Sequence, residues 1–174
     1  MRDESLIFAN ASQVVTCAGP ARARRGTELR DAAVLADAAV AVEGERIAGV
    51  GPLADLRARF PSAREIDCRR GVLTPGLVDS HTHGIFGRPR YDEQELRAAG
   101  MDYMEIARRG GGIHSSVRDL RQRDEDDLFA LAKPRLECLA SFGTTTVEVK
   151  SGYGLSLDDE LKTLRVIARL QREL

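Results

Sequence analysis

An apolar segment from Val72 to Val78 leads directly into the polar residues 79–83, which include His81 and His83. This pattern is typical of a buried strand over 72–81 that delivers side chains to a site at its carboxyl end, as strands of parallel α/β folds do. In a strand, residues i and i+2 point to the same side, about 7 Å apart along the backbone. The two imidazoles are therefore expected to face one point.

Two neutral imidazoles at a strand end form a natural half of a metal site, usually for zinc or iron. The chain has three histidines, and two of them are in this motif. An H-x-H pair also occurs by chance, and a catalytic metal normally takes three or more protein ligands. The remaining histidine, His114, is expected to be exposed rather than a ligand.

The segments after this strand alternate between helical and extended patterns. The sequence predicts helices over 93–109, 124–141 and from Ser156 onward, and a strand over 144–150. This order is the βαβ rhythm of a parallel sheet. The helix over 124–141 carries an apolar stripe that includes Leu128, Leu131 and Leu139, which we expect to be exposed unless further chain covers it.

The first seventy residues have the pattern of short strands and turns without catalytic groups. Strands are predicted over 6–10, 13–16, 39–42 and 47–50, the last two as a hairpin around Gly44. Residues 19–36 are expected to form a surface loop, and residues 53–60 one or two helical turns.

Composition excludes several classes of protein. Lys and Arg (26) nearly balance Asp and Glu (27), so the net charge of −1 gives no global field for nucleic acid or an anionic membrane. A content of 43% hydrophobic and 30% charged residues excludes wholesale disorder. No segment approaches the length of a membrane span, and Cys17, Cys68 and Cys138 are too far apart for a C-x-x-C motif. We expect a soluble cytoplasmic protein.

The end of the sequence suggests a larger fold. The second half supplies only two clear strands, too few to close a barrel, and its last helix runs to Leu174 without a capping glycine. We therefore expect an amino-terminal fragment.

The motif over 73–83 resembles the P-G-x-x-D-x-H-x-H signature of the metal-dependent amidohydrolase superfamily. Three further stretches are similar to the imidazolonepropionase family within it. They are Tyr103-Met104-Glu105-Ile106 with Gly110-Gly111-Gly112-Ile113, then Pro134-Arg135-Leu136, and then Thr145 to Leu155, which contains the run E-V-K-S-G-Y-G-L. The resemblance is close from about residue 70 onward and looser before it.

The resemblance implies an α/β fold with two parts. Residues 1–73 would form the amino-terminal share of a small β-sandwich, and residues 74–174 the first strands and helices of a distorted (β/α)8 TIM barrel. It implies that His81 and His83 bind one Zn2+ or iron ion, that Arg90 grips a substrate carboxylate and that Tyr153 hydrogen-bonds the substrate. Further ligands and the acid/base residues would lie beyond Leu174.

The implied reaction is hydrolysis of the ring amide of 4-imidazolone-5-propanoate to N-formimidoyl-L-glutamate, in histidine degradation, by a metal-activated water. The fragment alone would be inactive. Whether the full-length protein forms a homodimer is left open by the resemblance. Another amidohydrolase, such as a heterocycle deaminase or a cyclic amidase, would share His81 and His83. A small non-catalytic metal-binding or interaction protein is the third interpretation. Apart from the resemblance, the alternative for Arg90 is a solvated surface arginine, and for Tyr153 a loop tyrosine that covers the barrel end.

Overall fold

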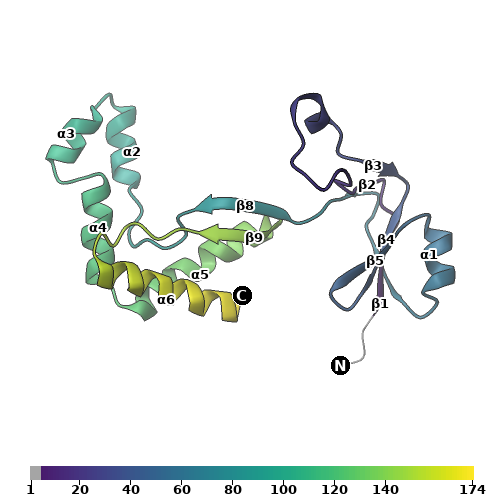
Figure 1. The fold of residues 1–174 in the computed structure, drawn as a ribbon. Helices are drawn as coiled ribbons and strands as arrows, with labels where there is room; N and C mark the ends of the chain where they lie inside the picture. Colours follow the sequence, from purple (N-terminus) through teal and green to yellow (C-terminus); the bar gives the residue numbers. More distant parts are fainter. Residues whose placement is uncertain (1–4) are drawn as a thin grey trace. The chain divides into compact units, whose positions relative to one another are not determined.

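The computed structural model describes residues 5–174, and the chain has mixed α/β structure (Figure 1). It divides into two compact units, Met1–Pro75 and Gly76–Leu174. Among the described residues, no helix is both long enough and apolar enough to cross a membrane.

The first unit is built on a four-stranded sheet with the order β5-β4-β1-β6. Its strands are β1 (Ser5–Ala9), β4 (Ala39–Glu43), β5 (Arg46–Gly51) and β6 (Arg64–Asp67). Strands β4 and β5 form the predicted antiparallel hairpin, with Gly44 in the turn at a positive φ of 55°. Strand β6 returns parallel to β1, after the helix α1 (Leu53–Arg59), which lies in the predicted helical segment.

Both faces of the central strands β1 and β4 are covered, because these strands carry small and branched apolar residues on both sides. One face packs Ile7, Ala39 and Ala41 against Leu56 of α1. The other face contributes Val40 to a second cluster that contains Ala11 and Val14. The sheet is therefore the central layer of the first unit.

A second sheet, with the order β3-β2-β7, carries the remaining strands of this unit. They are β2 (Gln13–Val15), β3 (Val34–Ala36) and β7 (Val72–Leu73). The expectation of an irregular loop over 19–36 is wrong in part. A 3-10 helix, η1 (Gly26–Arg30), forms there, and residues 34–36 pair with β2 as an antiparallel edge strand.

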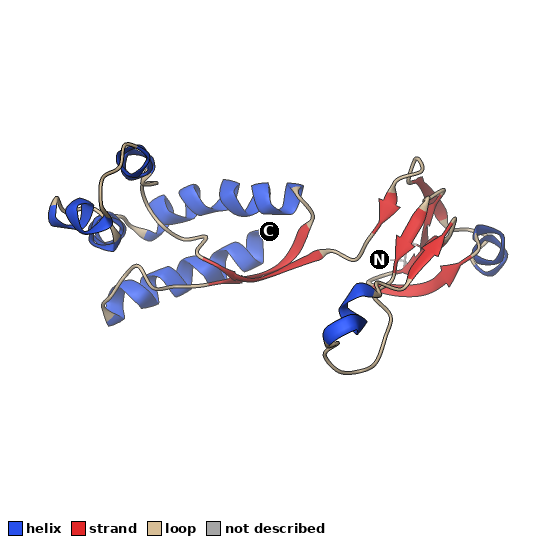
Figure 2. Ribbon diagram, turned by 90° about the horizontal axis from the view of Figure 1, so that it is seen from above, coloured by secondary structure: helices blue, strands red, loops and turns tan. Residues whose placement is uncertain are grey.

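The second unit consists of two parallel strands and five helices. Strand β8 (Leu77–Thr82) pairs with β9 (Thr144–Val149), as the βαβ rhythm predicts. The helices are α2 (Tyr91–Ala98), α3 (Tyr103–Arg108), α4 (Ile113–Gln122), α5 (Glu125–Ser141) and α6 (Leu157–Glu173). The two longest, α5 and α6, run alongside the strand pair (Figures 1 and 2).

The core of the second unit lies between α5, α6 and the strands. Its fully buried members include Leu128 and Val166, and the half-buried Val147 and Val149 of β9 pack against them. The expectation that the α5 stripe is exposed is wrong for Leu128, because α6 folds back onto it, and Leu131 and Leu139 are partly covered.

The expected single buried strand over 72–81 is divided at residues 74–76. Val72 and Leu73 pair with β2 of the first unit, and Leu77 begins β8 of the second. Pro75 cannot donate a backbone hydrogen bond, which favours a break there. Strand β8 is also less buried than predicted, since Leu77 and Val78 are 55% and 68% exposed.

The helix predicted over 93–109 is two helices, and a third follows that the pattern did not reveal. Gly100 adopts a positive φ of 91° after α2, and Asp102 then caps α3 by accepting the Met104 N–H. Residues 110–112 end α3 as predicted, but Gly112 also begins α4.

The loss of stability on substituting a buried leucine of α5, compared with that for an exposed leucine of α6, tests the packing of this core. Leu128→Ala removes a side chain that is 0% exposed and should lower the free energy of unfolding by about 2–5 kcal/mol. The control Leu157→Ala alters a leucine that is 75% exposed and should change it by less than about 0.5 kcal/mol. Urea unfolding followed by circular dichroism measures both, and equal effects would contradict this packing.

Candidate active site

The two histidines of the motif lie together at the carboxyl end of β8. Their ring centroids are 5.4 Å apart, and the rings meet edge to face at 72°. His81 is the penultimate residue of the strand, and His83 follows its last residue. The predicted convergence of the two imidazoles is therefore present in the fold.

Tyr153 comes to the same place from the segment after β9. Its ring centroid is 5.0 Å from that of His83. The parallel pairing brings the two segments together, since Thr82 is opposite Val149 and the Lys150 N–H donates to the Thr82 carbonyl at 2.7 Å. Two stretches about 70 residues apart in sequence thus meet at the carboxyl ends of the two parallel strands, where parallel folds place their sites.

The histidine pair fits part of a metal site. In the part of the chain that the structure describes, His83 Nδ1 is a buried nitrogen with no hydrogen-bond partner, and an unpaired buried polar atom calls for a ligand, a water or an ion. Across residues 5–174, no group of three or more His, Cys, Asp or Glu side chains converges. The described chain can therefore offer two imidazole ligands and would need others to complete the coordination.

The charged side chains near the histidines bind one another or the backbone. Lys150 forms an ion pair with Glu148, and this hydrogen bond holds the pKa of the Glu148 carboxyl below its ordinary value, with a smaller contribution from His81. Asp79 Oδ1 accepts the His81 backbone N–H at 3.0 Å. Asp79 thus binds the backbone near the end of β8, and Lys150 is paired with a carboxylate of β9.

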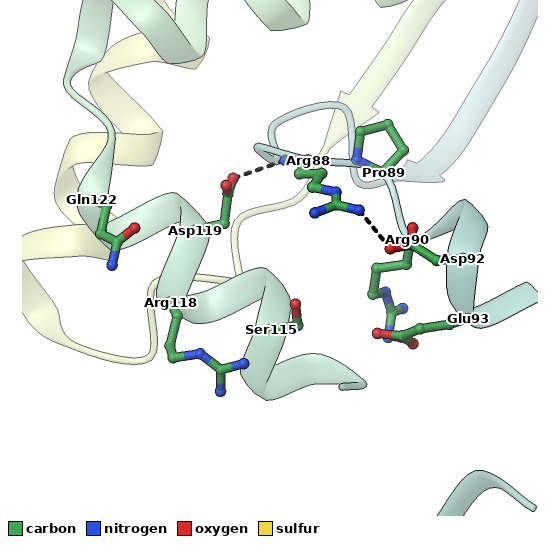
Figure 3. Close-up of a pocket in the computed structure, with 9 residues that line it drawn as sticks. All are labelled: Arg88, Pro89, Arg90, Asp92, Glu93, Ser115, Arg118, Asp119 and Gln122. Atoms are coloured by element: carbon green, nitrogen blue, oxygen red, sulfur yellow. Dashed lines mark hydrogen bonds and ion pairs between the residues drawn. The ribbon is translucent and has the colours of Figure 1, made fainter. Parts of the chain in front are cut away.

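Arg90 lies in a pocket of about 230 Å³ between the start of α2 and α4 (Figure 3). Its Nη1 is 3.3 Å from Glu93 Oε2, and the other oxygen of Glu93 accepts the Gly112 N–H at 2.9 Å. The lining is polar and consists of Arg88, Pro89, Arg90, Asp92, Glu93, Ser115, Arg118, Asp119 and Gln122. None of the three rings at the strand end is in this lining.

The loop that joins His83 to Arg90 is held by a cation from α5. The guanidinium of Arg135 donates to the carbonyls of Phe86 and Gly87 at 2.5 and 2.9 Å. It also stacks on the Phe86 ring, 3.6 Å from the centroid. Burial among the loop and α5 lowers the pKa of the Arg135 guanidinium from its ordinary value.

The loop that carries Tyr153 is held by an anion from α6. The carboxylate of Glu160 accepts the backbone N–H groups of Gly152, Gly154 and Leu155, each at 2.8 Å. Sequence reasoning noted Pro134-Arg135-Leu136 as a motif without a role, and it missed Glu160 and Glu93. Nothing in the sequence marks these side chains as different from ordinary solvated charges on a helix, and only the folded backbone shows which groups they bind.

Comparison with known proteins bears on the family. A bacterial imidazolonepropionase-like composite domain matches residues 38–63. The imidazolonepropionase of Chloroflexus aggregans is 48% identical over 165 residues, which is 95% of this chain and 39% of that protein. A probable imidazolonepropionase of Mus musculus is 45% identical over 97% of this chain and 41% of its own length. Along nearly its whole length, the chain is therefore similar to imidazolonepropionases. It spans about two fifths of the length of these curated relatives.

Solved structures agree on the fold. The crystal structure of an adenosine deaminase from Xanthomonas campestris with bound zinc superposes with a TM-score of 0.54 over 99% of this chain and 32% of that one. The two sequences are 20% identical, so this likeness concerns the fold alone. The curated relatives confirm the resemblance to imidazolonepropionases, and the structural likeness confirms the mixed α/β fold.

The contacts of Arg135 predict a large cost for its loss. Arg135→Met keeps much of the aliphatic stem but removes the guanidinium, and with it both the donors to the loop carbonyls and the stacking on Phe86, so the free energy of unfolding should fall by about 1–3 kcal/mol. The control is Arg97→Met, at an exposed position of α2, which should be nearly neutral. Denaturant unfolding of both variants gives the comparison, and a neutral Arg135→Met would mean that the loop does not depend on this cation.

Proposed function

We propose that this chain contributes to an enzyme that hydrolyses the ring amide of 4-imidazolone-5-propanoate to N-formimidoyl-L-glutamate. The observation that carries the proposal is the contact of Tyr153, from the S-G-Y-G-L loop, with His83 of the H-x-H motif. The first motif is shared across a superfamily, whereas the second is characteristic of imidazolonepropionases. Their contact at one sheet edge supports a single site built from both.

In this proposal, His81 and His83 are two ligands of a divalent zinc or iron ion. The unpaired Nδ1 of His83 and the 5.4 Å ring separation support that role. When bound, the metal supplies Lewis acidity, which activates water and polarises the ring carbonyl. The remaining ligands and the acid/base residues would come from chain that this sequence does not include.

The proposed architecture follows the same logic. The first unit would be a share of a composite β-sandwich, which the composite-domain match over 38–63 supports. The second would be the opening strands and helices of a distorted (β/α)8 barrel, with β8 and β9 as neighbouring barrel strands. Because parallel strands deliver their carboxyl ends to one face, later strands would add side chains beside His81 and His83.

Arg90 would bind the propionate of the substrate. A guanidinium carries five N–H donors, so the single contact with Glu93 leaves donors for a carboxylate. Its fork geometry suits bidentate pairing better than the point charge of a lysine. Tyr153 would offer its hydroxyl to the substrate from the other loop.

The arginine is tested by Arg90→Met in the full-length protein that contains this chain. Loss of a charge-assisted bidentate contact should lower kcat/KM by roughly 100-fold, since hydrogen bonds to charged groups contribute about 1.5–3 kcal/mol each. Arg108→Met, at a side chain that is 71% exposed, is the control and should leave kcat/KM near the parent value. Full activity of Arg90→Met would remove the basis for the propionate and favour another amidohydrolase reaction, such as deamination of a heterocycle.

The metal ligands are tested by a measurement independent of turnover. His81→Ala should lower the bound metal per chain several-fold, as measured by elemental analysis after dialysis, because a ligand is lost. His114→Ala changes the exposed third histidine and should retain the parent metal content. Equal metal content in both variants would exclude the H-x-H pair as the metal site.

A further inference from the structure

We infer that Glu160 is the positioning residue for Tyr153, acting through the backbone of the loop rather than on the substrate. This inference rests on the proposed function, because it gives Tyr153 a task that requires a fixed position. Glu160 belongs to the first turn of α6, and Tyr153 lies in the preceding loop.

The carboxylate of Glu160 holds the backbone on both sides of Tyr153. Oε2 accepts the Gly152 N–H, and Oε1 accepts the N–H groups of Gly154 and Leu155, all at 2.8 Å. Charge-assisted bonds of this kind are stronger than neutral ones, so one side chain fixes the residues flanking the tyrosine.

The two glycines make this arrangement sterically feasible. Gly152 has a positive φ of 127°, which side-chain-bearing residues rarely adopt. A Cβ on Gly154 would lie 2.7 Å from the backbone of Asp159 and of Glu160, so only glycine lets the loop pack this closely on α6. The S-G-Y-G sequence is thus the backbone that a carboxylate at position 160 can reach.

The surrounding charges agree with an ionised carboxylate. Burial alone would raise the pKa of Glu160, but the hydrogen bonds from Leu155, Ser151, Gly152 and Gly154 outweigh it and bring the pKa below its ordinary value. The amino-terminal end of α6 adds a favourable dipole. Arg121 of α4 completes the anchoring by donating to the Gly154 carbonyl at 2.8 Å.

The consequence concerns the tyrosine. The ring of Tyr153 is 5.0 Å from that of His83, and the loop bonds to Glu160 set that separation. If the anchor is weakened, the hydroxyl should sample other positions, and substrate binding should lose the contact without any change in the metal ligands.

The experiment is Glu160→Gln in the full-length protein, with Asp158→Asn as the matched control. Glutamine keeps the shape but replaces one acceptor oxygen by a donor and removes the charge. Asp158 lies in the same helical turn and is exposed. Hydrogen exchange of the amides at 152, 154 and 155 should accelerate at least about tenfold in Glu160→Gln and stay unchanged in the control.

A double-mutant cycle distinguishes positioning from general stability. Glu160→Gln should raise KM for 4-imidazolone-5-propanoate by roughly tenfold, with a smaller change in kcat and unchanged metal content. In a Tyr153→Phe background, the same substitution should add little to KM, because the hydroxyl it positions is already absent. Additive effects of the two substitutions, or unaltered amide exchange, would overturn the inference.

Failure of the proposed function gives a different result. A parent protein that binds metal but does not hydrolyse 4-imidazolone-5-propanoate would refute that function and, with it, the substrate contact proposed for Tyr153. The exchange measurement would still report whether Glu160 holds the loop. A parent that is active, with neither exchange nor KM altered in Glu160→Gln, would refute the positioning role alone.

Discussion

The parallel pairing of β8 with β9 is the interaction on which the candidate site depends. It aligns Thr82 with Val149, so that the residues that follow each strand emerge side by side. His83 comes from the first strand and the loop with Tyr153 from the second. Since a slip of one residue turns every side chain of a strand to the other face, the register itself selects which side chains meet.

Helices supply the charges that hold the segments following the two strands. The segment after β8 presents carbonyls, and the guanidinium of Arg135 donates to them. The loop after β9 presents N–H groups, and the carboxylate of Glu160 accepts them. The carbonyls of one loop thus pair with a cation, and the N–H groups of the other pair with an anion. Both loops at the carboxyl end of the strands are held in place without forming further secondary structure.

Local patterns predicted much of the fold. The hairpin around Gly44, the strand over 144–150 and the helix from Ser156 onward each depend on neighbours in sequence, and each is present. The division of the 72–81 segment was not predictable from hydrophobicity, because it depends on β7 pairing with β2, about 60 residues earlier. The third helix, α4, was missed for a related reason, since its apolar residues are few and its burial depends on packing.

The features of the candidate site also fall into two groups, those that local sequence predicts and those that depend on the folded chain. The H-x-H spacing is a local signal and predicted the meeting of His81 and His83. The loop contacts of Glu160 and Arg135 are not local signals, because a carboxylate or guanidinium in a helix is usually solvated and only the folded backbone reveals its partners. The residues that line the Arg90 pocket could likewise not be predicted from a sequence spacing.

The most direct test of the account is the position of the metal in the full-length protein. Anomalous diffraction at the zinc edge, on crystals grown with zinc, locates the ion independently of any assay. The account predicts one peak about 2.0–2.1 Å from a ring nitrogen of both His81 and His83, with Tyr153 beside it. A metal bound elsewhere, with both imidazoles outside its coordination sphere, would contradict the account.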